Sequence, residues 1–191
     1  LENNWKLIDQ SRGWIKDFEF RDALEKIRKL WVWHDDNKKV RELIAVEADF
    51  EAEIGRALFI GSVDRVERDS DGKIFIVDLK SGKEISKADA LENKQLSGYQ
   101  LAVLEGAFKN EEIRGEVSGS SLVYLGTDNK SAAVREQGPI DHESVRSEVA
   151  AAAEAMGAAE FFATVNDRCR KCPVKKVCPI QADGRSVLDG N

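Results

Sequence analysis

The stretch from Gly61 to Lys83, which reads GSVDRVERDSDGKIFIVDLKSGK, constrains the fold of this chain more than any other. Two runs rich in β-branched and apolar residues flank a Ser-Asp-Gly sequence at positions 70–72. β-branched and apolar residues favour strands, and Asp-Gly favours a tight turn. The stretch is therefore predicted to form a β-hairpin.

The register of this hairpin decides which charged side chains meet. With a three-residue loop, Asp69 pairs with Lys73, and the same register sets Asp64 opposite Asp78. Directly opposed side chains share one face of a sheet, with Cβ atoms about 4.5–5.5 Å apart. Because side chains alternate between faces along a strand, Lys80 projects from the same face as Asp78. The sequence predicts two carboxylates and one ammonium on a single face.

Two opposed carboxylates destabilise a sheet unless a cation joins them. Mg²⁺ is usually held by one or two carboxylates together with water and substrate phosphate. A divalent cation between Asp64 and Asp78 is therefore one interpretation of the hairpin. The other is a charged, solvated face of an edge hairpin, and an Asp followed by D-x-K does not by itself separate the two.

The segments on either side of the hairpin add candidate site residues. Residues 40–54, VRELIAVEADFEAEI, alternate acidic and apolar residues, which predicts a half-buried strand with an acidic face. Glu47 lies at the start of this alternation and is the acid we assign to the site. A helix is predicted over residues 87–108, where Gln95 and Tyr99 are four residues apart and share one face.

The remaining pattern predicts a helix, three strands, a helix, one or two strands and a final helix. Outside the segments already described, the predicted elements are a helix at 21–33, strands at 122–125 and 131–135, and a helix at 141–164. His34 follows the first helix beside Asp35 and Asp36 and is expected in a polar surface turn, with a metal role as the alternative. The four tryptophans all lie before His34. We interpret them as packing residues, with nucleobase stacking as the alternative.

Length and charge bound the class of protein. The 191 residues suffice for one domain, or for one domain with an appendage. A net charge of −6 argues against a nonspecific nucleic-acid-binding surface. The argument is weak for a metal-dependent nuclease, because its active site must itself be acidic. No apolar run approaches the roughly 20 residues of a membrane span, and no signal peptide is visible. Because the first residue is Leu and not Met, we expect a fragment or a processed chain.

All three cysteines lie close together near the C-terminus. Cys169, Cys172 and Cys178 form a C-x2-C-x5-C-P pattern, which favours metal or cluster ligation over a disulfide framework. Thiolates at such spacings bind iron–sulfur clusters or structural zinc, and both remain open. Either one indicates a reducing compartment, so we expect a cytoplasmic protein. Residues 182–191 are polar and are expected to be poorly ordered.

Taken in order, these motifs resemble the PD-(D/E)XK nuclease superfamily, and within it the RecB/AddB-type exonuclease domain of bacterial helicase–nucleases. The matching residues are Glu47 in VEADFE, Asp64 in GSVDRV, Asp78 and Lys80 in VDLKSGK, Gln95 and Tyr99 in a Q-x3-Y helix, and the three cysteines of the C-terminal iron–sulfur signature. The resemblance covers about residues 40–180.

This resemblance implies an α/β (mixed α+β) fold with a restriction-endonuclease-like core, in which helices flank a central mixed β-sheet. Four regions are expected: a helical segment at 1–39, the nuclease core at 40–166, an iron–sulfur-type cysteine tail at 167–181 and a disordered C-terminus at 182–191. The implied activity is that of a metal-dependent DNA exonuclease domain within a helicase–nuclease for double-strand-break repair. Its implied partners are single-stranded or end-unwound DNA and a helicase motor, in the same polypeptide or another subunit, and no membrane.

The resemblance also implies a role for each site residue. Mg²⁺ or Mn²⁺ would bind Asp64, Asp78 and the carbonyl of Leu79, with Glu47 holding a second metal or a metal-bound water. Lys80 would orient water or stabilise the phosphate, and we expect electrostatics to outweigh a general-base role because nearby carboxylates keep its pKa high. Gln95 and Tyr99 would contact the nucleic-acid backbone, although Tyr99 also suits a core aromatic role. A [4Fe–4S] cluster would bind Cys169, Cys172 and Cys178.

Two features depart from the family pattern. Such domains usually carry a metal-binding histidine on an upstream helix, and neither His34 nor His142 has a matching sequence context. Cluster-containing members take a fourth cysteine from far upstream, and this sequence has none. A fragment would show both features. Two alternatives therefore stay open: a catalytically inactive module that binds DNA ends or scaffolds a complex, and a CRISPR-adaptation nuclease with the same core.

Overall fold

The computed structural model describes residues 4–8, 12–159 and 163–181. The chain divides into two compact units, residues 1–150 and residues 151–191, which are described separately. Among the helices of the described ranges, none combines the length and the apolar composition that crossing a bilayer requires. The predicted boundaries at residues 39, 166 and 181 stay predictions.

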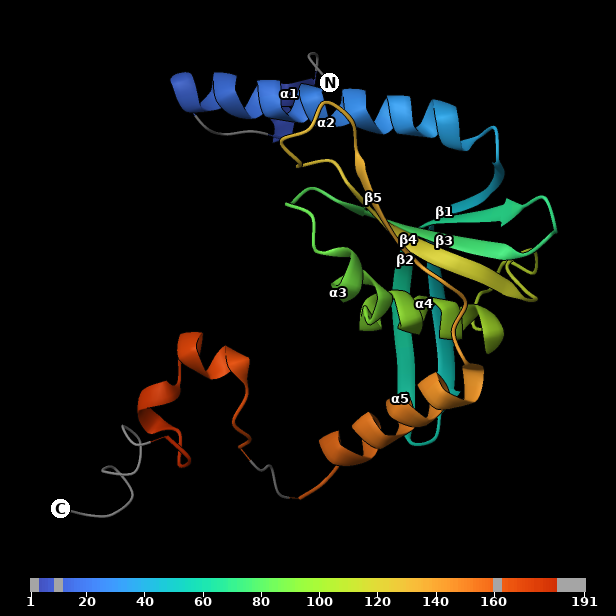
Figure 1. The fold of residues 1–191 in the computed structure, drawn as a ribbon, viewed down its shortest axis with the longest axis vertical. Coiled ribbons are helices and arrows are strands. Elements are labelled where there is room, and N and C mark those ends of the chain that lie inside the picture. The colour runs from blue at the N-terminus through green and yellow to red at the C-terminus, as the bar shows by residue number, and fades with distance from the viewer. Residues whose placement is uncertain (1–3, 9–11, 160–162, 182–191) are drawn as a thin grey trace. The chain divides into compact units, whose positions relative to one another are not determined.

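A five-stranded sheet forms the centre of the first unit (Figure 1). Its order follows the sequence: β1 (Arg41–Ile54), β2 (Ala57–Asp69), β3 (Ile74–Lys80), β4 (Val117–Tyr124) and β5 (Ala133–Gln137). The β3–β4 pair is parallel and the other three pairs are antiparallel, so the sheet is mixed. Parallel neighbours need a crossover connection. Here the crossover carries α3 (Lys87–Leu91) and α4 (Lys94–Leu104).

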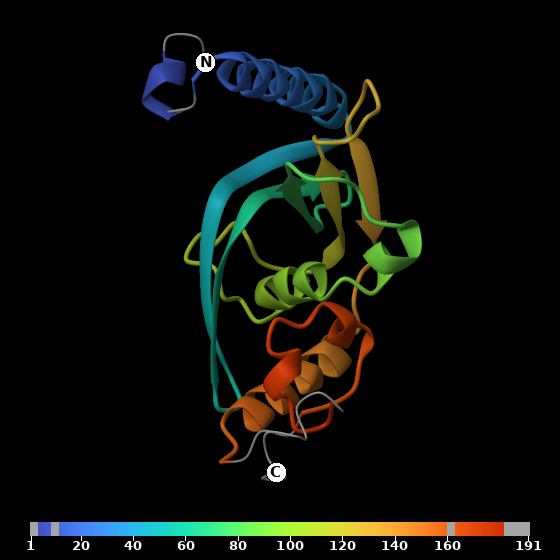
Figure 2. The same cartoon turned by 90° about the vertical axis from the view of Figure 1, so that its left-hand side faces the viewer.

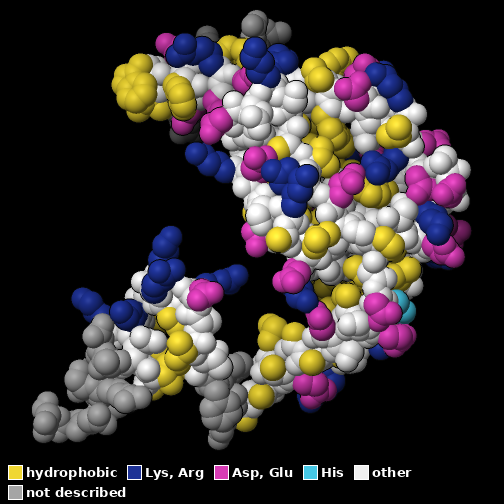
Figure 3. All heavy atoms as spheres, in the orientation of Figure 1, with side chains coloured by type: hydrophobic (Ala, Val, Ile, Leu, Met, Phe, Trp, Pro, Cys, Tyr) yellow, Lys and Arg dark blue, Asp and Glu magenta, His cyan; other side chains and the backbone are white. Residues whose placement is uncertain are grey.

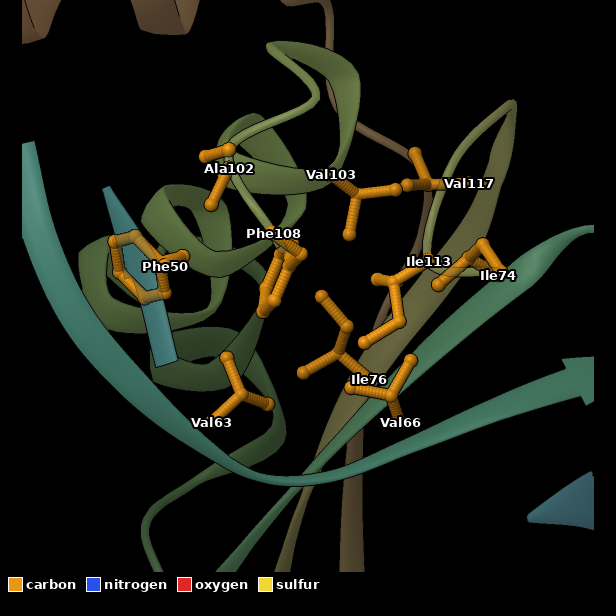
Figure 4. Close-up of a cluster of buried hydrophobic side chains, with 11 residues drawn as sticks. Phe50, Val63, Val66, Ile74, Ile76, Ala102, Val103, Phe108, Ile113 and Val117 are labelled. Carbon is orange, nitrogen blue, oxygen red and sulfur yellow. The ribbon is translucent and has the colours of Figure 1, made fainter. Parts of the chain in front are cut away.

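Helices cover both faces of the sheet. The central strand β3 is apolar on both of its faces, and each face packs against a helix. Ile74 and Ile76 face α4 and join the main core, whose labelled members Figure 4 shows between the sheet and this helix. Phe75 and Val77 face the other way and pack with Leu30 and other residues against α2 (Trp14–Asn37). The predicted fold class, a mixed sheet flanked by helices, is confirmed. Two further helices are α1 (Trp5–Ile8) and α5 (His142–Met156).

Some helix boundaries differ from those predicted. The helix expected over residues 87–108 is two helices, because the Asn93 side chain accepts a hydrogen bond from the Leu96 N–H at 3.0 Å and caps the start of α4. α2 is longer than expected and includes His34, so the prediction of a surface turn at His34 is wrong. α5 ends at Met156, short of the predicted residue 164, and residues 160–162 lie outside the described ranges.

The hairpin between β2 and β3 has the predicted register. Asp69 donates its N–H to the carbonyl of Lys73 at 3.0 Å, and the ladder continues to the pair of Arg65 and Val77. The loop is residues 70–72, with Gly72 at φ 78°, where glycine carries no steric penalty. Beyond Arg65, β2 pairs only with β1, while β3 continues alongside β4.

The two longest strands, β1 and β2, form a curved hairpin that bends around α4 (Figure 2). Two irregularities accompany the bend on β1. The register shifts between Leu43 and Ala45, and Glu47 has φ 48°. Left-handed backbone is uncommon for a residue other than glycine and costs roughly 1–3 kcal/mol. The irregular part of β1 therefore includes Glu47, a residue assigned to the site.

The second unit carries the cysteines. Its described residues include two short 3₁₀ helices, η2 (Asp167–Lys171) and η3 (Lys175–Val177). Cys169, Cys172 and Cys178 are free thiols of intermediate exposure. Lys and Arg side chains gather on this unit in Figure 3, where they appear dark blue. The predicted disordered C-terminus, residues 182–191, lies outside the described residues.

Candidate active site

The candidate site lies at the fork where β2 leaves β3. Past the pair of Arg65 and Val77, the two strands no longer form a ladder. The Leu79 N–H instead donates to Oδ2 of Asp64 at 2.7 Å. A side-chain oxygen thus satisfies a main-chain donor that the ladder no longer serves. This bond fixes the Asp64 carboxylate beside the end of β3, where Asp78 and Lys80 lie.

The β1–β2 register adds a third acid to the fork. The pairs Val46–Arg65 and Ala48–Val63 bracket Glu47 and set it opposite Asp64. The β2–β3 register in turn continues from Arg65–Val77 toward Asp64 and Asp78. Glu47, Asp64 and Asp78 therefore occupy successive positions across three neighbouring strands. The Glu47 side chain is exposed and the other two are progressively more buried.

Asp78 is the most buried of the three acids, with 2% of its surface exposed. Its Oδ1 accepts a hydrogen bond from Nε2 of Gln95 at 3.0 Å. Nζ of Lys80 lies 2.7 Å from its Oδ2. This contact is an ion pair. One oxygen of the Asp78 carboxylate is therefore bound by Gln95, and the other is held by the charge of Lys80.

Burial and neighbouring charge shift the pKa values at the fork. Burial raises the pKa of Asp78, and the charge of Asp64 adds to this effect, while Lys80 opposes both. For Lys80, burial lowers the pKa, but the hydrogen bond and charge of Asp78 outweigh it. The pKa of Lys80 is therefore raised above its ordinary value. At neutral pH Lys80 is an ammonium, as expected from its position beside the carboxylates.

Helix α4 brings Gln95 and Tyr99 to the fork from one face, as their spacing predicts. Gln95 accepts a hydrogen bond from Nζ of Lys80 at 3.0 Å. Its Nε2 lies 2.7 Å from the hydroxyl oxygen of Tyr99. Burial raises the pKa of the Tyr99 hydroxyl. The ring of Tyr99 contacts Phe50 edge-on, so Tyr99 has both a packing contact and a contact within the site.

One residue near the fork was not assigned to it from sequence. His34 lines a cavity of about 440 Å³ together with Glu47, Asp64 and Leu79. Its Nδ1 is buried and has no hydrogen-bond partner within the described part of the chain. The sequence spacing of His34 from Leu30 could have indicated this position. Residues four apart on a helix share a face, and Leu30 faces the sheet. His142, by contrast, contacts Glu105 at 2.6 Å.

The donor atoms at the fork suit a hard divalent cation. Magnesium needs only one or two protein carboxylates and takes its other ligands from water and phosphate. Asp64 and Asp78 offer two, beside the Leu79 peptide. In the described ranges, no three His, Cys, Asp or Glu side chains are grouped closely enough to hold a metal. The fork therefore fits a cation completed by water and substrate, not a closed protein cage.

The cysteines were assigned to a separate cluster, and the structure places them in the second unit. The main-chain N–H of Asn166 donates to Sγ of Cys169 at 3.3 Å. Among the described residues, the cysteines form no group of three metal ligands.

The mixed sheet, its flanking helices and the acids at the fork define a restriction-endonuclease-like protein. The family model of the PD-(D/E)XK nuclease superfamily matches residues 1–179. The chain therefore belongs to this superfamily, whose members are typically metal-dependent nucleases. One similar solved structure is titled "Crystal structure of SSO0001"; it is 21% identical, with a TM-score of 0.42, over 83% of this chain and 70% of the other. No curated protein matches the chain.

Proposed function

We propose that this chain is a divalent-metal-dependent deoxyribonuclease that hydrolyses phosphodiester bonds. The observation that carries this proposal is the fork, where the Asp64 carboxylate, the Leu79 peptide, Asp78 and Lys80 are joined by contacts of 2.7 Å. Superfamily membership supplies the reaction class. The raised pKa of Asp78 supports a cation at this point, because its burial and the charge of Asp64 both disfavour a bare carboxylate.

Asp64, Asp78 and the carbonyl of Leu79 are the proposed metal ligands, and Glu47 would hold a second ion or a water molecule. When bound, a divalent ion supplies Lewis acidity and makes a bound water more acidic. Oδ2 of Asp64 is already oriented by the Leu79 N–H, so this ligand needs little rearrangement. The exposed Glu47 has more freedom and suits the outer position.

Lys80 and Gln95 would act on the phosphate. Since the pKa of Lys80 is raised, its ammonium stays charged and can stabilise negative charge that develops on the phosphate oxygens. Gln95 contacts both Lys80 and Asp78, and so fixes their relative positions. Tyr99 supports Gln95 from the next turn of α4 and can contact the substrate backbone with its hydroxyl.

We also propose His34 as a metal ligand or a ligand to metal-bound water. Its unpartnered Nδ1 and its place in the cavity beside Glu47 and Asp64 support this role. A neutral imidazole is a common metal ligand. His34 would then supply the upstream histidine that nucleases of the RecB/AddB type usually carry.

The finer assignment is to the RecB/AddB type: an exonuclease domain that acts on single-stranded or end-unwound DNA supplied by a helicase motor. The cysteine pattern supports this assignment. Cys169, Cys172 and Cys178 are proposed ligands of a [4Fe–4S] cluster whose fourth ligand comes from elsewhere. Iron analysis of anaerobically purified protein tests the cluster, and zinc in its place would contradict it.

A nuclease assay on linear single-stranded DNA with Mg²⁺ or Mn²⁺ tests the proposed activity. We expect cleavage by the wild type and a loss of at least about 100-fold in Asp78→Asn. Asp71→Asn is the matched control, because Asp71 is an exposed aspartate in the loop of the same hairpin. Wild-type protein that binds DNA but never cleaves it would favour the inactive, end-binding alternative.

A further inference from the structure

An apolar groove runs from the fork along α2. It is the cavity of about 440 Å³ that His34 lines. Its polar end comprises His34, Glu47, Asp64 and Arg65. Its apolar wall comprises Ile27, Leu30, Trp31, Trp33, Leu43, Val46 and Leu79. The groove is therefore continuous with the proposed metal site, and not a separate surface.

Trp31 is the unusual member of the wall. Its side chain is 70% exposed, and within the described residues no aromatic ring packs against it. Trp33 differs, because it packs in the core beneath α2 and its ring faces the guanidinium of Arg65 at 5.5 Å. An indole of this size buries a large area when it finds a partner. Trp31 thus offers a flat, uncovered ring beside the acids.

The charges at the polar end limit what can cover the groove. Glu47 and Asp64 have no salt-bridge partner in the described ranges. The two nearby cations are already paired: Arg65 with the buried Glu67, and Lys80 with Asp78. A protein segment or a second copy that brings no Lys or Arg to this end of the groove would bury unpaired carboxylates, at a cost of several kcal/mol. A nucleic-acid strand that arrives with a divalent cation meets no such penalty.

We propose that this groove is a nucleobase subsite, in which an unpaired base next to the scissile phosphate stacks on the Trp31 indole. The inference rests on the proposed function, because it assumes that a phosphate lies at the fork. Asp64 and Leu79 line both the fork and the groove. A strand bound at the fork must therefore place a neighbouring nucleoside near the groove. A base within a duplex is stacked and paired, so the subsite selects single strands.

Stacking also predicts the base preference of the proposed subsite. Every base has a π-face, and stacking on an aromatic ring is tolerant of base identity. The groove therefore requires that a base be present and is largely indifferent to which base it is.

Binding to two oligomers of equal length tests the subsite: labelled oligodeoxythymidylate, and a strand of abasic deoxyribose phosphate. Ca²⁺ replaces Mg²⁺ to limit cleavage, since it also takes oxygen ligands. We expect Trp31→Ala to weaken binding of the thymidylate roughly fivefold to hundredfold and to leave the abasic strand unaffected. Trp31→Phe should retain most of the affinity. The control is Trp14→Ala on the same helix, 77% exposed and outside the groove, which should change neither.

Three results would overturn the subsite. Trp31→Ala could weaken both strands equally or neither. Alternatively, sedimentation could show a wild-type dimer that Trp31→Ala dissociates, which would make the groove an interface between copies.

The two proposals fail in different ways. If the wild type cleaves DNA and Trp31→Ala shows no base-dependent loss, the subsite is refuted and the proposed function stands. If the wild type never cleaves with Mg²⁺ or Mn²⁺ while the base-dependent loss persists, the proposed function is refuted and the groove stands as a base-binding site.

Discussion

The N–H of Leu79 donates to Oδ2 of Asp64 at 2.7 Å, at the position where β2 leaves β3. One oxygen of Asp64 thus takes the place of a main-chain acceptor. Burial raises the pKa of Asp78, and the charge of Asp64 adds to this effect. Asp64 therefore has a structural role and a proposed chemical role, and substitutions can separate them.

Asp64→Asn should lose activity without losing stability. The asparagine carbonyl can still accept the Leu79 hydrogen bond, whereas the charge that binds metal is gone. Asp64→Ala removes both and should cost roughly 1–3 kcal/mol of unfolding free energy, measured by urea denaturation. Equal destabilisation by the two substitutions would show that the charge, not the hydrogen bond, holds the fork together.

Asp78 should make metal-free stability fall as the pH rises. Its folded pKa is raised above the unfolded value of about 3.9, so its stabilising contribution is present below that value and is lost as the pH rises through the folded pKa. Asp78→Asn should therefore be more stable than the wild type at neutral pH in a chelator, with the difference vanishing below about pH 4. Urea denaturation at both pH values measures this. A less stable Asp78→Asn at pH 7 would contradict it.

Divalent cations should stabilise the wild type in the absence of any substrate. Saturation at a hundred times Kd adds about 2.7 kcal/mol, because the ion binds only the folded state. Mg²⁺ or Mn²⁺ should raise the wild-type Tm, and EDTA should reverse the shift. Asp64→Asn and Asp78→Asn should lose this response. Glu51→Gln, on the exposed acidic face of β1, should retain it.

The two histidines should respond differently to alanine substitution. His34→Ala should raise the metal concentration needed for half-maximal activity, because His34 lines the cavity beside Glu47 and Asp64. His142→Ala should leave that concentration unchanged, since His142 contacts Glu105. Titration of activity with Mn²⁺ distinguishes the two variants. An identical response would remove His34 from the proposed site.

Alanine substitution of two glutamines on α4 should have opposite effects: one variant should lose mainly stability and the other mainly nuclease activity. Gln100 is fully buried and donates to Ser120 at 2.8 Å and to Gln137 at 3.2 Å. Gln100→Ala leaves these buried groups short of partners and should cost about 1–3 kcal/mol or more. Gln95→Ala, at an exposed position, should cost little stability but most of the activity. Thermal unfolding and the nuclease assay together test the contrast.

The sequence predicts local relationships at the site well. The length of the loop gives the pairing of Asp69 with Lys73, and helical spacing gives the shared face of Gln95 and Tyr99. These depend on the period of a strand and of a helix, which nearby residues determine. The hairpin register and the helix face were therefore predicted correctly.

Features that depend on distant contacts were not predicted. His34 was placed in a turn because helix ends are the weakest signal in a sequence, and α2 extends beyond it through contacts such as Asn37 with Glu67 at 2.5 Å. The β2–β3 ladder ends at Arg65 and Val77, and β1 and β2 bend around α4; no local sequence pattern encodes either feature. The left-handed backbone of Glu47 was not predicted either.

That bend has a mechanical consequence. No ladder bond joins β2 to β3 beyond Arg65 and Val77, so the backbone at Asp64 is held by its pairing with β1 and the backbone at Asp78 by its pairing with β4. A change in the curvature of the hairpin would alter the separation of the two carboxylates while every ladder bond stays intact. The hydrogen bond between Leu79 and Asp64 is then the contact that limits the separation of β2 and β3 at the fork.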